Sequence, residues 1–183
     1  MLEALRKRRR NREIVDELYA SVVNRSRVPA LFEDGGLPDT VMGRFEALSL
    51  EMFLALHRCS GDPELAPLAQ DLVDRFMLDV DHSIRELGIG YQAVPKRMRK
   101  LAGRFYARVD ALKGPLAARD GQALEAALRH SVLGEDGARG AEQFLARHLL
   151  VESERLAHWP QEKILSGSLP RPAGDDEDVY GAD

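Results

Sequence analysis

The sequence contains only one cysteine, Cys59, among its 183 residues. An internal disulfide is therefore excluded, a structural zinc site would need other ligands, and a reducing compartment is indicated. No apolar run approaches the ~20 residues that a transmembrane helix requires. The basic N-terminus is not followed by the apolar segment of a secretory signal. We therefore expect a cytoplasmic protein without a membrane-spanning segment.

Strand signals are missing as well, because nowhere does apolar alternation at period 2 persist through β-branched residues. Apolar residues recur instead at helical spacing. With 44% hydrophobic and 31% charged residues, the chain has the composition of a soluble globular protein. We predict an all-α fold, a single compact domain of about six helices. The expected helices span about residues 9–24, 39–59, 64–87, 95–112 (ended by Gly114 and Pro115), 120–131 and 141–157.

The expected helix at 39–59 is apolar nearly all round its middle, which predicts the central, most buried helix. Met52 and Phe53 have two interpretations, as ordinary core residues or as part of an adaptable binding surface. Gly43 inside this helix costs ~1 kcal/mol relative to alanine. That cost suggests the close approach of another helix at Gly43, for which the helix of Tyr106 is the candidate.

Charge is distributed unevenly, and the net charge of −4 hides this. Residues 1–12 carry six cationic side chains against Glu3, and residues 173–183 carry five acidic ones. We therefore divide the chain into a basic N-terminal segment (1–12), a helical domain (12–166) and an acidic tail (167–183) that we expect to be disordered. Arg8, Arg9 and Arg10 are candidate contacts for an anionic membrane or RNA; the alternative is a solvated helix end.

Residues 72–109 are the most distinctive stretch, because Gly88 and Gly90 join a helix of mixed charge to a strongly basic one. The first helix carries Asp79, Asp81, Arg85 and Glu86, and the second carries Lys96, Arg97, Arg99, Lys100, Arg104 and Arg108. Arginine binds carboxylates in a bidentate manner. These charges therefore either pair with one another across the corner or form a surface that binds a partner, and both interpretations remain open.

Signatures of catalysis are lacking. There is no G-x-S-x-G motif and no glycine-rich phosphate-binding loop after a strand. Asp79 and His82 lie three residues apart on one helix, but a di-metal site needs two such pairs and further carboxylates. We therefore expect no metal, no cofactor and no enzymatic activity. A pI of about 5.8, without the helical spacing of a DNA-binding motif, predicts no DNA partner.

Four motifs occur in an order that resembles one known family. They are LPDTVMGRF (37–45), FMLDVDHSIRELGIG (76–90), VPKRMR (94–99) and FYAR (105–108). Together they are similar to the ubiquinol–cytochrome c chaperone family, over about residues 12–155. Two positions depart from the usual family pattern: Tyr91 stands where the family usually has Asp, and Ala107 where it often has Gly.

The resemblance implies a non-enzymatic assembly factor for ubiquinol–cytochrome c reductase, respiratory complex III, with newly made cytochrome b as its client. It further suggests a position near the ribosome's tunnel exit. A peripheral contact with the inner membrane is expected from the basic N-terminal segment. We expect client-binding residues within the family-like motifs, namely Arg44, Asp79, Asp81, Arg85, Glu86, Lys96, Arg97, Arg104 and Tyr106. The alternative function is an RNA- or ribosome-binding helical module. A helical enzyme or a metal protein is a weaker alternative.

Overall fold

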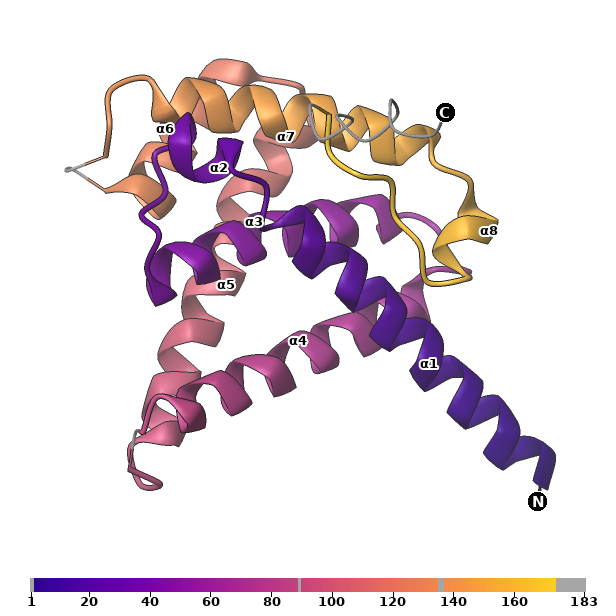
Figure 1. Ribbon diagram of the computed structural model, residues 1–183. Coiled ribbons are helices and arrows are strands. Elements are labelled where there is room, and N and C mark those ends of the chain that lie inside the picture. Colours follow the sequence, from indigo (N-terminus) through magenta and orange to yellow (C-terminus); the bar gives the residue numbers. More distant parts are fainter. Residues whose placement is uncertain (1, 89, 135–136, 174–183) are drawn as a thin grey trace, which may run out of the picture.

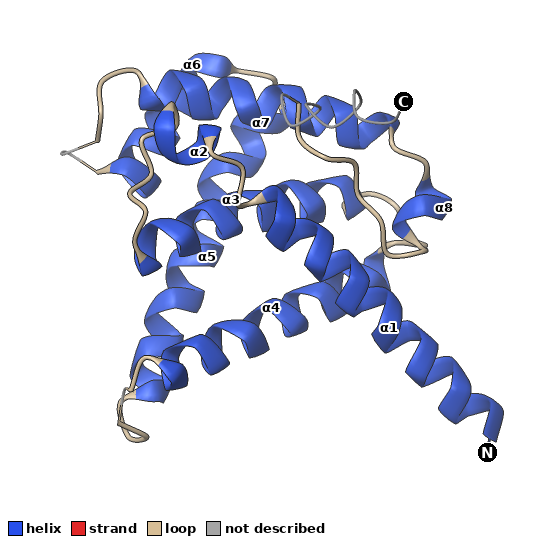
Figure 2. Ribbon diagram, viewed as in Figure 1, coloured by secondary structure: helices blue, strands red, loops and turns tan. Residues whose placement is uncertain are grey.

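The computed structural model describes residues 2–88, 90–134 and 137–173, and within them it has helices and no strand (Figure 2). The elements are α1 (Leu2–Arg25), α2 (Ala30–Glu33), α3 (Val41–Cys59), α4 (Ala66–Glu86), α5 (Val94–Ala117), α6 (Gly121–Leu128), a π-helical turn η1 (Arg129–Leu133), α7 (Ala141–His158) and α8 (Gln161–Ile164). The two shortest, α2 and α8, have four residues each. The predicted all-α class with about six long helices is confirmed.

The helices are arranged around α3 (Figure 1). α6 and α7 lie along one side of the molecule, whereas α4 runs away from this body and α5 returns to it. The connection between α4 and α5, of which the structure describes residues 87–88 and 90–93, thus lies at an extremity. We name these residues the α4–α5 corner. The N-terminal half of α1 projects at another extremity (Figure 1). No helix in the described ranges is both long and apolar enough to span a bilayer.

The predicted end of α5 before Gly114 and Pro115 is wrong, because the helix continues through both residues to Ala117. Pro115 cannot donate the backbone hydrogen bond to the preceding turn, a loss that would normally break a helix. Here Leu112 and Leu116 are both buried on one face, and the helix ends two residues after the proline. Packing of that face therefore holds the last turn in place.

α3 lies between two apolar clusters and contributes to both. Phe45 and Met52 belong to the cluster formed with α1, α4 and the first half of α5, whereas Leu50, Phe53 and Leu54 belong to the one formed with α6, α7 and the end of α5. The predicted central helix is thereby confirmed. Met52 and Phe53 are 0% and 2% exposed, so their interpretation as core is right and their interpretation as binding surface is wrong.

A buried ion cluster joins α1, α3 and α7. The guanidinium of Arg25 donates to Glu51 at 2.7 Å and to Glu152 at 2.9 Å, and all three side chains are at most 2% exposed. His148 Nε2 lies 2.7 Å from the other oxygen of Glu51. Burial by itself would raise the pKa of Glu51, but the hydrogen bonds from His148 and Arg25 outweigh it and lower the pKa.

The same cluster holds residues 168–173 against the helices. Arg25 also donates to the carbonyl of Pro170, and the backbone N–H of Ala173 donates to Glu152 at 2.8 Å. The indole N–H of Trp159 donates to the carbonyl of Ser168 at 2.9 Å. The first part of the acidic tail segment is thus in contact with α1 and α7. Residues 174–183 lie outside the described residues, and their disorder stays a prediction.

Candidate functional site

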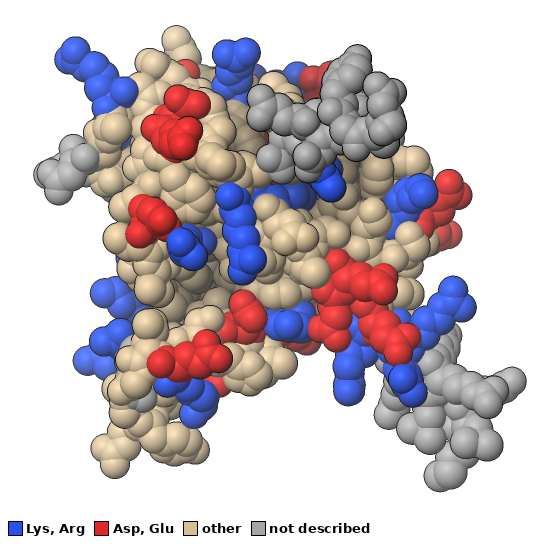
Figure 3. Space-filling model, viewed as in Figure 1, with Lys and Arg blue, Asp and Glu red and all other residues tan. Residues whose placement is uncertain are grey.

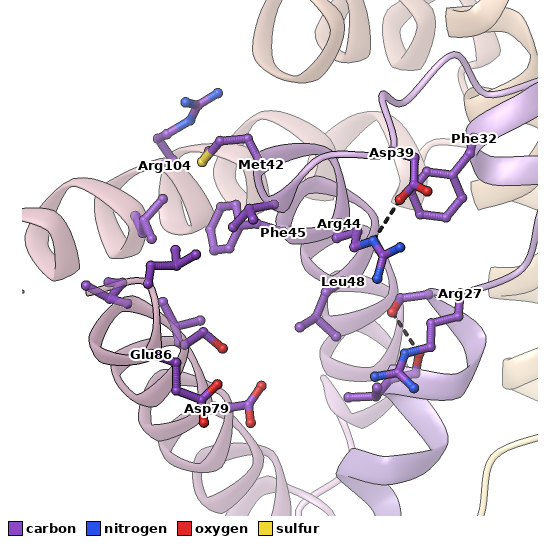
Figure 4. A pocket seen from close by; sticks show the side chains of 18 of the residues that line it. Arg27, Phe32, Asp39, Met42, Arg44, Phe45, Leu48, Asp79, Glu86 and Arg104 are labelled. Atoms are coloured by element: carbon purple, nitrogen blue, oxygen red, sulfur yellow. Dashed lines mark hydrogen bonds and ion pairs between the residues drawn. The ribbon is translucent and has the colours of Figure 1, made fainter. Parts of the chain in front are cut away.

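The described residues form an open groove of about 1140 Å³. Its walls are the first half of α3, the second half of α4, the first turns of α5 and the segment that follows α1 (Figure 4). The apolar lining includes Val23, Phe32, Val41, Met42, Phe45, Leu48, Val80, Ile84, Leu87 and Leu101. The charged lining consists of Arg27, Arg44, Arg97, Lys100 and Arg104 together with Glu33, Asp39, Asp79 and Glu86. An apolar surface flanked by both signs of charge therefore faces the groove.

The α3 wall is positioned by the turn that precedes it. Thr40 caps the helix, because its hydroxyl oxygen accepts from the N–H of Gly43 at 3.2 Å. A Cβ at Gly43 would lie 1.8 Å from the carbonyl oxygen of Pro38, so only glycine permits this fold-back. The expected approach of the Tyr106 helix to Gly43 is therefore wrong: the close neighbour is the chain just before α3. This tight start leaves Val41 and Met42 at the mouth of the groove, 56% and 39% exposed.

The opposite wall depends on the α4–α5 corner. Gly88 adopts a φ of +73°, which most side chains disfavour, and it ends α4. The chain then enters α5 at Val94, with Pro95 in the first turn as predicted. This geometry brings Glu86 and Leu87 of α4 into the same groove as Arg97 of α5. Figure 4 shows Asp79 and Glu86 across the hollow from Phe45 and Leu48.

Some charges of the groove are already paired. Arg44 donates to Asp39 at 2.7 Å, and this hydrogen bond lowers the pKa of Asp39 and raises that of Arg44 (Figure 4). The carboxylate of Asp79 accepts from the hydroxyl of Tyr19 at 2.9 Å. The pKa of Tyr19 is raised, first by burial and then by the neighbouring Asp79. Arg97, in contrast, makes no ion pair with a carboxylate of the described residues.

A buried carboxylate, Glu46, underlies the Arg104 end of the groove. Arg104 contacts it at 3.0 Å and Arg108 contacts its second oxygen. Arg108 is 1% exposed and also donates to the carbonyl of Ser131 in η1 at 3.2 Å. Burial raises the pKa of Glu46 and lowers that of Arg108, although each group partly compensates the other. Glu46 therefore fixes Arg104 at the edge of the groove.

The predicted client-binding residues are divided between the groove and the outer surface. Arg44, Asp79, Glu86, Arg97 and Arg104 line the groove. Four others lie outside the groove, namely Lys96, Asp81, Arg85 and Tyr106. Asp81 and Arg85 pair with each other at 2.6 Å along α4, and Tyr106 is 51% exposed with its ring against Phe105.

The proposed ion pairs across the α4–α5 corner are not formed among the described residues: Asp79 and Asp81 contact other partners, and Arg104 contacts Glu46. Arg108, one of the cationic residues of the basic helix, is buried and is therefore not part of its outer surface. Sequence reasoning missed Glu46, although a glutamate in a helix expected to be central is itself a signal of a buried pair.

The basic N-terminal segment is part of α1, which starts at Leu2 rather than near residue 9. Arg9 and Arg10 are exposed, and Arg9 pairs with Glu13 at 3.0 Å. The side chain of Arg8 lies outside the described residues. No group of three His, Cys, Asp or Glu side chains within the described ranges has the geometry of a metal site.

An all-helical chain whose main cavity is an open apolar groove flanked by charges has the features of a protein that binds another polypeptide. The family model described as ubiquinol–cytochrome C chaperone matches residues 33–171. The crystal structure of the Cbp3 homolog from Brucella abortus is 41% identical, with a TM-score of 0.81, and the match covers 93% of this chain and 96% of that chain. No curated protein gives a significant match.

The chain belongs to the ubiquinol–cytochrome c chaperone family, as its four motifs indicated. Membership of a chaperone family implies a role without catalysis.

Proposed function

We propose that this protein is an assembly chaperone of ubiquinol–cytochrome c reductase that binds newly made cytochrome b in the groove. The observation that carries the proposal is the coincidence of the groove with the family-like motifs. Residues 37–45, 76–90 and 94–99 all contribute side chains to its walls. The fourth motif supplies Arg108, which holds Glu46 beneath Arg104.

The chemistry of the groove suits such a client. A membrane subunit that has not yet been assembled exposes apolar helices next to charged loops. An apolar helix face can be buried against Val41, Met42 and Leu87, which are between 39% and 56% exposed without a partner. Arg97 then remains available for a carboxylate in the adjoining loop. The groove thereby covers a client's apolar surface until its final partners bind.

The direct test is a charge placed on the apolar wall. We expect Val41→Asp to abolish co-purification of cytochrome b from detergent-solubilised membranes and to lower the amount of assembled complex III on native gels. The melting temperature should stay nearly unchanged, because an exposed Asp in the first turn of α3 is compatible with the helix dipole. The matched control is Val151→Asp on α7, which is 40% exposed and outside the groove. Normal cytochrome b capture by a stable Val41→Asp variant would contradict the proposal.

A charge reversal at Arg97 tests the polar side of the groove. An exposed charge without an ion pair contributes little to stability, typically within ±0.5 kcal/mol. Arg97→Glu should therefore leave thermal unfolding unchanged but weaken cytochrome b capture, whereas the control Arg147→Glu on α7 should change neither. The same reversal at Arg104 is less informative, because it would place a second carboxylate beside Glu46 and destabilise the fold. Unchanged capture by Arg97→Glu would remove Arg97 from the client-binding set.

We further propose a peripheral, cytoplasmic position at the inner membrane, with the projecting end of α1 as one contact. Replacing Arg8, Arg9 and Arg10 by Gln should weaken binding to anionic vesicles, most visibly at low salt. Equal binding of both forms to neutral and anionic vesicles would refute this contact. Capture of ribosomal RNA instead of cytochrome b would favour the RNA- or ribosome-binding alternative.

A further inference from the structure

The α4–α5 corner carries apolar side chains that are largely exposed to solvent. Tyr91 is 82% exposed and Leu87 is 53% exposed, and Tyr91 is the most exposed of the large hydrophobic residues described. The guanidinium of Arg85 lies over the ring of Tyr91, 5.5 Å from its centroid. The corner therefore presents an aromatic and an aliphatic side chain to solvent at an extremity of the molecule (Figure 1).

Positive charge surrounds this apolar end. Residues 85–100 carry five cationic side chains and one acidic one, a net charge of +4 in a chain whose total is −4. Lys96, Arg97, Arg99 and Lys100 are all exposed, and none forms an ion pair with a carboxylate of the described residues. In Figure 3, residues other than Lys, Arg, Asp and Glu form the end of the corner, and side chains of both charges lie next to it. Arg97 and Lys100 line the groove, whereas Lys96 and Arg99 do not.

We propose that the α4–α5 corner docks on an anionic lipid bilayer, with Tyr91 and Leu87 at the level of the headgroups and Lys96 and Arg99 against the lipid phosphates. Aromatic residues are enriched at membrane interfaces because their rings are amphipathic, and cations beside an anionic surface add attraction. A projecting corner can enter a soft bilayer, whereas a small-molecule site is normally concave. Bases of single-stranded RNA would stack on an aromatic ring such as Tyr91, but they would not favour the aliphatic Leu87.

This docking surface shares Leu87 with the groove. Its test therefore uses Tyr91, Lys96 and Arg99, which belong neither to the groove nor to the basic end of α1. Full-length protein is mixed with vesicles of phosphatidylcholine, with and without an equimolar amount of phosphatidylglycerol, and bound protein is measured by flotation. Lys96→Gln combined with Arg99→Gln should lower the partition coefficient on anionic vesicles at least tenfold, since each charge near such a surface contributes roughly fivefold. Tyr91→Ser should lower the partition coefficient on each kind of vesicle to which the protein binds measurably.

The matched control removes one arginine and one lysine elsewhere. Arg147→Gln with Lys163→Gln changes the net charge equally, and both residues are exposed and lie outside the groove. Hydrogen exchange of the unmodified protein should slow about threefold or more within residues 87–101 when anionic vesicles are added.

Three results would overturn the inference. The first is a corner variant that binds vesicles as well as its control. The second is loss of binding only when Arg8, Arg9 and Arg10 are replaced. The third is binding of the corner to single-stranded RNA without affinity for vesicles. Cytochrome b capture by the Lys96→Gln/Arg99→Gln variant in detergent is measured separately, so that failure of the groove and failure of the corner can be told apart.

Discussion

Replacing Arg25 by Met should destabilise the protein by about 3–5 kcal/mol, the usual effect of removing one partner from a buried ion pair. Methionine has similar length and no charge, so the packing of α1 is largely retained. Glu51 and Glu152, which are 0% and 1% exposed, lose their shared cation. The carbonyl of Pro170 loses its donor too. Residues 168–173 should therefore detach from the helices in the variant before global unfolding begins.

The size of this effect is large for a domain of this length. Total stabilities are typically about 5–15 kcal/mol. A loss of about 1 kcal/mol lowers the melting temperature of a chain of this size by about 2–4 °C, which gives a fall of about 6–20 °C for Arg25→Met. Calorimetry measures the fall in melting temperature, and urea unfolding measures the loss of free energy of unfolding. Arg147→Met on the surface of α7 is the control, for which we expect a change within about 0.5 kcal/mol.

The pH dependence separates the charge from the packing. In the unmodified protein the pKa of Glu51 is lowered in the folded state. Glu51 therefore stabilises the fold above its unfolded pKa, and this contribution is lost as the pH falls through the folded pKa. Burial raises the pKa of Glu51 and Arg25 lowers it. Without Arg25 the pKa of Glu51 should therefore rise. The stability deficit of the variant should then be largest near neutral pH and should shrink on acidification, as Glu51 takes up a proton.

A deficit of less than about 1 kcal/mol at neutral pH, or one that is equal at pH 7 and pH 5, would refute this reasoning. A further variant provides a positive test. Arg25→Met combined with Glu51→Gln and Glu152→Gln removes both buried carboxylates of this cluster, so neither is left as a buried charge without a cationic partner. Recovery of much of the lost stability is therefore expected.

Three further predictions concern local features. Gly43→Ala should destabilise the fold, although the same change at an open helical site stabilises by about 1 kcal/mol, because the new Cβ would meet the carbonyl oxygen of Pro38; a stabilised variant in urea unfolding would contradict this. Thr40→Ala should cost about 1 kcal/mol by removing the α3 cap, and Thr40→Ser should restore it. Burial raises the pKa of the Cys59 thiol to about 11, so iodoacetamide at pH 8 should modify it only in denaturant; rapid labelling of the folded protein would show that the thiol is accessible.

The sequence was sufficient to locate most of the helices, because their apolar spacing and terminal residues are local signals. Gly88 and Gly90 were correctly predicted to lie between the helices that became α4 and α5. The end of α5 was predicted wrongly because Pro115 is a local signal that packing at a distance overrides. Its local preference argues for a helix end, but the burial of Leu112 and Leu116 comes from helices distant in the sequence and outweighs that preference.

The site was harder to predict than the fold. A helical wheel places Arg97, Arg104 and Arg108 on one side of α5, and this side does meet the rest of the molecule. The wheel does not reveal how far α3 extends along α5. Arg97 is exposed, Arg104 lies at the edge of the groove and Arg108 is fully buried against Glu46. Which of these arginines remains exposed therefore depends on packing between helices that are far apart in sequence.

The position of α3 between two apolar clusters gives the groove two walls of unequal stiffness. The α3 wall is held from behind by Leu50, Phe53 and Leu54, whereas the second half of α4 and the start of α5 belong to one cluster alone. We therefore expect the wall made by α4 and the start of α5 to be the more mobile of the two. A groove with one rigid and one mobile wall can accept apolar segments of different thickness while their contact with α3 stays the same. Hydrogen exchange should accordingly be faster in residues 80–101 than in α3.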